Sequence, residues 1–128
     1  MGVDLNHTIV HAGDPWAAAR EVAGLLGLPE PSAYGPFAVV ETDNGASLDF
    51  LQDSGEIAGQ HYAFLVSEDD FDAIWGRLRD QGRQWWADPF KNRPGEINHG
   101  DGGRGLYWEG PDGHWLEIIT RPYGSGTA

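Results

Sequence analysis

The sequence contains a half-repeat, in which a strand led by histidine, a helix, and a hairpin whose last strand has a central carboxylate occur twice in the same order. The first copy covers about residues 4–53 and the second about residues 60–121. The polar residues that the two copies share are, in chain order, His7, Asp49, His61 and Glu117. Because histidine and carboxylate side chains on neighbouring strands can hold a metal ion, the repeat predicts a two-module domain over residues 1–128 with a place for metal chemistry.

Both predicted helices have ends that the sequence specifies. Asp14 precedes a proline and is a typical N-cap acceptor, and Gly27 is a typical C-terminal stop. In the second copy, Ser67 with Asp70 three residues later resembles a capping box, and apolar residues then recur at helical spacing. These signals place one helix directly after the first strand of each copy.

The segments between the helices and the hairpins are less regular. Prolines and a Gly-Pro pair in residues 29–36 indicate a loop, and the pair Trp85-Trp86 predicts a short strand. We expect a long loop at residues 91–103 and a disordered tail at residues 124–128. The resulting order favours an α+β fold with a curved sheet, whose concave side forms a cup.

Strand side chains alternate between two faces, which directs the polar candidates into the cup. In the last strand, Leu116 and Ile118 are the residues expected to pack on the helix, so Trp115 and Glu117 face the other way. The same argument directs Tyr107 and the other polar candidates of the half-repeat to the cup. A carboxylate in the middle of an apolar strand is costly to bury without a partner, and a metal ion with imidazole neighbours would be such a partner.

Each candidate also has a simpler interpretation. The two histidines would then be locally bonded or half-exposed strand residues, and Asp49 would bond only a neighbouring strand or loop. Arg104 either neutralises an anionic substrate or pairs with Glu117 or Asp101. Trp115 and the other tryptophans are either core and dimer contacts or an aromatic wall around a ligand.

Composition excludes several classes of function. The chain has no cysteine, which excludes disulfides and thiolate chemistry, and no apolar run is long enough to span a membrane. Eight basic and 20 acidic residues give a net charge of −12, which argues against a nucleic-acid partner. The acidity favours solubility, or attraction of a metal cation or a cationic ligand, and we expect a cytoplasmic protein.

The strand led by His7, the stretch His61-Tyr62-Ala63-Phe64 and the ending Pro111-Asp112-Gly113-His114-x-Leu116-Glu117 together resemble the vicinal oxygen chelate superfamily. This group includes glyoxalase I, fosfomycin-resistance enzymes, extradiol dioxygenases and bleomycin-binding proteins. The resemblance covers about residues 4–120 and implies a glyoxalase-like fold of paired βαβββ modules. It also implies a divalent metal held by His7, His61 and Glu117, and a homodimer whose sites are often shared between chains.

Other site residues follow from individual branches of this family. Asp49 falls where glyoxalase I has a glutamate that serves as fourth ligand and catalytic base, but its side chain is shorter. His99 is a candidate for the additional acid–base histidine of extradiol dioxygenases, or else an exposed loop histidine. Tyr107 either donates a hydrogen bond to substrate or closes the barrel with its hydroxyl.

Two functions from different classes remain open. The first is a metal-dependent lyase or dioxygenase that binds two oxygens of a small substrate to iron, zinc, manganese or nickel, with Lewis-acid catalysis. The second is a metal-free protein that sequesters a drug or metabolite, which the net charge of −12 and the six tryptophans suit if the ligand is cationic and aromatic. The set of His7, His61 and Glu117 favours the metalloenzyme.

Overall fold

The structure is a computed structural model that describes residues 2–126. The chain divides into two compact units, Met1–Ala58 and Gly59–Ala128. In the part of the chain that is described, no helix combines the length and the apolar character needed to cross a membrane.

The first unit is a helix packed on a mixed four-stranded sheet. Its elements are β1 (His7–Ala12), α1 (Pro15–Leu26), β2 (Ser32–Tyr34), β3 (Phe37–Glu41) and β4 (Ser47–Gln52). The strand order is β1-β4-β3-β2, with β1 parallel to β4 and the other pairs antiparallel. The first strand of the unit therefore pairs with its last strand, as a strand–helix–hairpin repeat requires.

The predicted ends of α1 are confirmed. The Asp14 side chain accepts a hydrogen bond from the backbone N–H of Ala17 at 3.1 Å, and Gly27 has the left-handed φ of 72° that ends many helices. Strand β2 replaces part of the expected loop at residues 29–36. Its three residues pair with β3 in a hairpin turned at Gly35 and Pro36, a local pairing that the surrounding prolines concealed.

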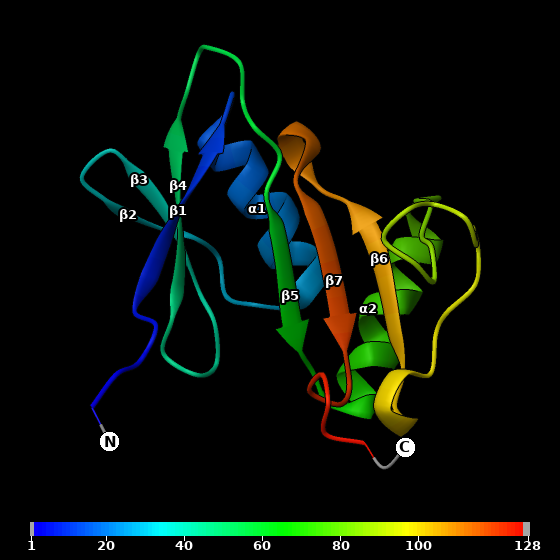
Figure 1. Cartoon of the computed structure of the whole chain (residues 1–128). Helices are drawn as coiled ribbons and strands as arrows, with labels where there is room; N and C mark the ends of the chain where they lie inside the picture. The colour runs from blue at the N-terminus through cyan, green and yellow to red at the C-terminus, as the bar shows by residue number, and fades with distance from the viewer. Residues whose placement is uncertain (1, 127–128) are drawn as a thin grey trace. The chain divides into compact units, whose positions relative to one another are not determined.

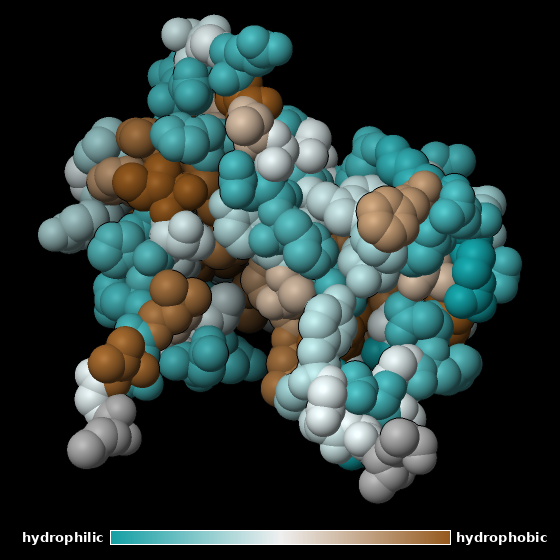
Figure 2. Space-filling model, in the orientation of Figure 1, coloured by the Kyte–Doolittle hydropathy of each residue, from teal (hydrophilic) through white to brown (hydrophobic). Residues whose placement is uncertain are grey.

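The first sheet has one face on α1 and one open face. Val10, Val40 and Phe50 are among the core residues on the helix side. The open face retains exposed apolar side chains such as Ile9, and Figure 2 shows hydrophobic surface over the strands of this unit. Alternation along β1 and β4 places His7 and Asp49 on this open face as well.

The second unit repeats the arrangement with one strand fewer. Its elements are β5 (His61–Leu65), α2 (Glu68–Asp80), β6 (Gly105–Glu109), β7 (Trp115–Ile119) and two short 3-10 turns, η1 (Gly100–Gly102) and η2 (Pro111–Gly113). The strand order is β5-β7-β6, with β5 parallel to β7 and β6 antiparallel to it. Figure 1 shows these three strands side by side with α2 along one face.

Helix α2 begins as predicted, because the Ser67 hydroxyl accepts a hydrogen bond from the backbone N–H of Asp70 at 3.1 Å. Its apolar stripe is buried against the sheet. The core residues of this unit on the helix side are Phe71, Ile74, Leu78, Leu106, Trp108, Leu116 and Ile118. The α+β class predicted from the sequence is therefore confirmed in both units.

The pair Trp85-Trp86 does not form the predicted strand. Trp86 makes only isolated bridges, to Pro94 and to Tyr107 of β6. Asn98 makes a further isolated bridge to Gly105, so the long loop between α2 and β6 is fastened to the free edge of β6 at two points. The second unit consequently has two strands after its helix, where the βαβββ pattern expects three.

Candidate functional site

Parallel pairing of β5 and β7 brings His61 and Glu117 together. His61 pairs with Trp115, and Ala63 pairs with Glu117. The histidine and the glutamate are therefore offset by two residues along adjacent strands, so their side chains are on the same face. Alternation puts both on the face away from α2. This is the placement predicted from the sequence pattern.

The contact between the two side chains is direct. Nε2 of His61 lies 3.0 Å from Oε1 of Glu117, and Nδ1 of the same ring lies 2.9 Å from the carbonyl oxygen of Trp115. Because a carbonyl only accepts, Nδ1 carries a proton, and Nε2 then presents either a second proton or a lone pair toward the carboxylate. The arrangement suits an imidazolium–carboxylate ion pair, or a cation held between a neutral imidazole and the carboxylate.

Glu117 is buried to 1% exposure and has a further partner that the sequence analysis did not identify. The Tyr123 hydroxyl lies 2.7 and 2.6 Å from the two carboxylate oxygens, and the Tyr107 hydroxyl lies 3.1 Å from that of Tyr123. Since Tyr123 has one proton and directs it to the carboxylate, Tyr107 is the donor in the contact between the two hydroxyls. The four side chains form one hydrogen-bonded chain from Tyr107 to His61.

Both tyrosines remain protonated in this chain. Burial, then the hydrogen bond with Tyr123 and the charge of Glu117, raise the pKa of Tyr107. Burial and the hydrogen bond to Glu117 likewise raise the pKa of Tyr123, against a smaller lowering by Tyr107. The hydroxyls are therefore donors, and Tyr123 directs its proton to the buried carboxylate.

Tyr123 lies in a segment that was expected to lead into a disordered tail. The described part of that tail is instead fixed by Asp101, whose two carboxylate oxygens accept hydrogen bonds from the backbone N–H groups of Gly124 and Gly126, each at 3.1 Å. The last two residues of the predicted tail, 127–128, lie outside the described part of the chain. This anchoring accompanies the placement of the Tyr123 hydroxyl on Glu117.

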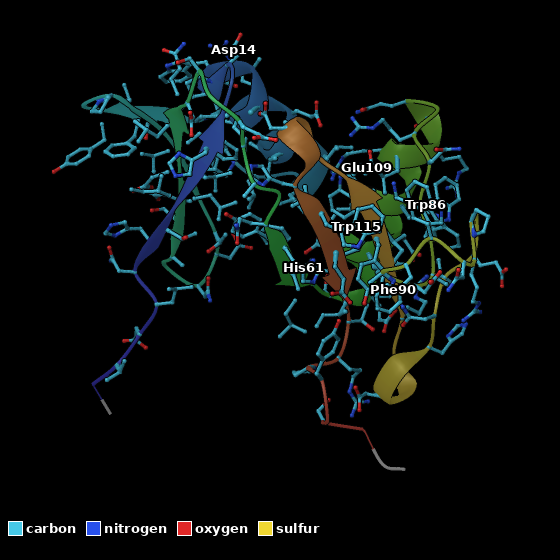
Figure 3. All side chains as sticks on the ribbon, turned by 45° about the horizontal axis from the view of Figure 1, so that its top comes forward. Asp14, His61, Trp86, Phe90, Glu109 and Trp115 are labelled. Atoms are coloured by element: carbon cyan, nitrogen blue, oxygen red, sulfur yellow. The ribbon has the colours of Figure 1, made fainter. Side chains whose placement is uncertain are left out.

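An aromatic surface, consisting of Trp86, Tyr107 and Trp115, lies beside the carboxylate. The rings of Tyr107 and Trp115 stack at 5.9 Å with 14° between their planes, and those of Trp86 and Trp115 are 5.4 Å apart. His61 stacks on Tyr107 at 5.9 Å, which joins this surface to the histidine. Figure 3 labels His61, Trp86 and Trp115 along the second sheet and the loop beyond it.

Lys91 adds a cation to the aromatic surface. Its Nζ lies 5.1 Å from the ring of Trp86 and 5.4 Å from that of Trp115, and it forms an ion pair with Glu109. Lys91 has a φ of 60°, in the left-handed region. The Asp88 side chain, which accepts hydrogen bonds from three backbone N–H groups of the same loop, holds this turn in place.

The predicted site residues of the first unit have local partners. Nδ1 of His7 lies 2.7 Å from the side-chain oxygen of Asn6, and Asp49 accepts a hydrogen bond from the Ser47 hydroxyl at 2.8 Å. Across residues 2–126, no three histidine, aspartate or glutamate side chains are grouped so that they could hold a metal ion. The structure thus brings together His61 and Glu117, and the third predicted ligand, His7, stays a prediction.

Arg104 pairs with neither of the partners named for it from the sequence. Its guanidinium bonds Glu68 at 2.7 Å and Asp72 at 2.8 Å, both on α2, and lies over the ring of Phe71. The residue precedes β6 and turns toward the helix, so these ion pairs replace the expected ones with Glu117 or Asp101. Its role in substrate binding stays a prediction that these contacts do not favour.

His99 lies in the loop before η1. Its ring is exposed, and Nδ1 lies 3.2 Å from the carbonyl oxygen of Gly103. Tyr107 and Trp115, by contrast, lie on the face of the second sheet away from α2, as alternation predicted. Of the residues assigned catalytic or substrate-binding roles, these two are the ones that the structure places beside Glu117 and His61.

Comparison with known proteins gives strong similarity to two solved structures. Oxidase ChaP-H2 is 63% identical, with a TM-score of 0.96 over 99% of this chain and 100% of its own. Oxidase ChaP-H1 is 60% identical, with a TM-score of 0.94 over 96% of this chain and 99% of its own. No family model matches the sequence, and the search of curated proteins found no match.

More distant solved structures share the fold. The fosfomycin resistance protein FosX from Mesorhizobium loti is 18% identical, with a TM-score of 0.67 over 95% of each chain. A lactoylglutathione lyase from Agrobacterium tumefaciens is 14% identical, with a TM-score of 0.68 over 97% of this chain and 96% of its own. The glyoxalase-like fold expected from the sequence motifs is therefore confirmed.

Proposed function

The chain belongs to the same family as Oxidase ChaP-H1 and Oxidase ChaP-H2, which it matches over nearly its whole length. From this relationship and the vicinal oxygen chelate motifs of the sequence, we propose that it is a divalent-metal-dependent oxidase of a small, oxygen-bearing aromatic molecule. The observation that carries the proposal is the pairing of His61 with the buried Glu117, 3.0 Å apart. The choice of an oxidase is supported by two proteins named oxidases that are 60% and 63% identical over nearly the whole chain.

The side chains of His61 and Glu117 together offer donors that suit a metal ion. Nδ1 of His61 is fixed by a backbone carbonyl, which directs Nε2 toward the ion position, and Glu117 offers carboxylate oxygens from a buried strand. His7 would be the third ligand, as the family motif implies. Imidazole and carboxylate donors are compatible with iron, zinc, manganese or nickel, and the bound ion would supply Lewis acidity toward the substrate oxygens.

The protein's own residues would bind and orient the substrate. The stacked rings of Tyr107 and Trp115 provide an apolar face for an aromatic ring next to Glu117. Lys91, above the rings of Trp86 and Trp115, would attract a negatively charged oxygen of that molecule. We propose that Asp49, at the position of the glyoxalase I glutamate, or His99, the candidate for an additional acid–base histidine, moves the proton.

A metal-free sequestration protein is the second candidate. It is favoured by the fact that Glu117 already has protein partners, since His61 and Tyr123 together occupy both of its oxygens. The aromatic surface would then serve binding alone. In either case we propose a small-molecule ligand and, from the family resemblance, a homodimer.

Oxygen uptake distinguishes the two candidates. The protein is loaded separately with each of the four divalent metals and mixed with hydroxylated aromatic probes, for example catechol and 1-naphthol, in an oxygen electrode. An oxidase consumes oxygen with at least one probe only when it is loaded with metal, and His61→Ala abolishes the uptake. Probe binding that is unchanged by chelator, with no oxygen uptake in any loaded form, would support sequestration instead.

A further inference from the structure

The segment 121–126, which follows β7, is held against the loop at Asp101 by several independent contacts. Both carboxylate oxygens of Asp101 accept backbone hydrogen bonds, from Gly124 and from Gly126. Within the segment, the Ser125 hydroxyl and its backbone N–H both donate to the carbonyl of Pro122, which closes a turn. These contacts fix the backbone conformation of the segment.

At Gly126, the segment packs closely against the backbone of Asp101. A Cβ atom built on this residue would lie 2.4 Å from Cα and from the carbonyl oxygen of Asp101, and such distances do not occur between real atoms. These contacts involve backbone, which cannot move aside as the end of a side chain would. Only glycine can therefore dock at this position.

Tyr123 depends on this docking for its position. Its side chain is 67% exposed, so packing contributes little to holding the ring in place. Its hydroxyl nevertheless reaches both oxygens of the buried Glu117, at 2.7 and 2.6 Å. The hydrogen bonds to Asp101, immediately after Tyr123 in the chain, restrain the backbone from which the ring projects.

We propose that the segment 121–126 is a latch and that Tyr123 is a positioning residue, which keeps the Glu117 carboxylate oriented with Oε1 toward His61. The inference rests on the proposed function in one respect, namely that this orientation serves metal binding. A ligating carboxylate that rotates freely binds a metal less well, and removing an outer hydrogen bond to a ligand typically lowers metal affinity by about 10- to 100-fold.

The first measurement needs no metal. Tyr123→Phe removes one oxygen from a largely exposed side chain, so the fold is not at risk, and Tyr34→Phe is the matched control in the first unit. We expect Tyr123→Phe to shift the ¹⁵N NMR signal of His61 Nε2 in the metal-free protein. Asp101→Ala should produce the same shift and should increase hydrogen exchange of the Gly124 and Gly126 amides, whereas Asp43→Ala should change neither.

The second measurement is Co²⁺ affinity by calorimetry, with the visible spectrum of the bound ion as a second readout. We expect Tyr123→Phe and Asp101→Ala each to weaken Co²⁺ binding about 10-fold or more and to alter the spectrum. The variant with both substitutions should bind Co²⁺ about as tightly as whichever single variant binds it less well, because both substitutions remove the same restraint on Glu117.

The results separate the latch from the proposed function. If wild type binds no Co²⁺, the metalloenzyme proposal fails, while the NMR comparison still tests the latch. The latch is refuted if Tyr123→Phe leaves the His61 signal unchanged. It is also refuted if the effects of Tyr123→Phe and Asp101→Ala on Co²⁺ affinity are additive, since Asp101 would then not act through Tyr123.

Discussion

Nε2 of His61 and Oε1 of Glu117 lie 3.0 Å apart on two parallel strands, whose counterparts in the first unit carry His7 and Asp49. The register is equivalent, because Glu117 pairs with the residue two positions after His61, and Asp49 pairs with the residue two positions after His7. In the first unit the two side chains bond Asn6 and Ser47 instead. The same topology thus forms a direct histidine–carboxylate contact where the acid is glutamate.

Replacement of Trp115 by leucine should weaken the binding of aromatic ligands. The ring stacks on Tyr107 and contacts Trp86, so its loss removes the centre of the aromatic surface. We expect the Kd for 1-naphthol to rise about 10-fold, equivalent to about 1.4 kcal/mol, in a fluorescence or calorimetric titration. Trp16→Leu in α1 is the control, and an equal loss in that variant would contradict the assignment.

Stability at acid pH should depend on Arg104. The hydrogen bond from Arg104, followed by that from Thr120, lowers the pKa of Glu68. A carboxyl whose pKa is lower in the folded than in the unfolded protein contributes stability above its ordinary value of 4.5 and loses it as the pH falls through the folded value. Wild type should therefore be more stable than Arg104→Gln at pH 7, with a difference that shrinks below about pH 4.5.

Thermal unfolding of the two proteins between pH 3 and pH 7 measures this difference. Arg20→Gln is a suitable control, because Arg20 forms an exposed ion pair with Glu30. It should change the melting temperature less than Arg104→Gln does. A difference between wild type and Arg104→Gln that is constant across this pH range would contradict the role assigned to Glu68.

Two glycine substitutions should act in opposite directions. A Cβ on Gly110 would lie 2.7 Å from Cδ1 of the buried Leu116, so Gly110→Ala should lower the free energy of unfolding by about 1–3 kcal/mol. Gly24 lies within α1 with open space at its Cβ position, and Gly24→Ala should stabilise the helix by about 0.5–1 kcal/mol. Chemical denaturation measures both. A stabilising Gly110→Ala would contradict the close packing on Leu116, and a destabilising Gly24→Ala would contradict the open space at Gly24.

Much of the site could be predicted because it lies on strands. Alternation along a strand needs only local sequence, and it correctly placed Glu117, Tyr107 and Trp115 on one face. Tyr123 could not be found in this way, because it lies in an irregular segment whose position depends on a distant carboxylate, Asp101. The partners of Arg104 were missed for a similar reason, since the residue lies just outside β6 and turns toward α2.

Anaerobic calorimetric titration with Fe²⁺ tests most directly whether His61 and Glu117 hold a divalent metal ion. Wild type should bind one ion per chain, and His61→Ala and Glu117→Gln should each weaken binding by more than the roughly 10- to 100-fold typical of losing an outer hydrogen bond, since the first removes a ligand and the second removes its anionic donor. His11→Ala, which removes an exposed histidine of β1, should bind as wild type does. Wild-type protein that binds no Fe²⁺, or ligand variants that bind it as tightly as wild type, would contradict the account.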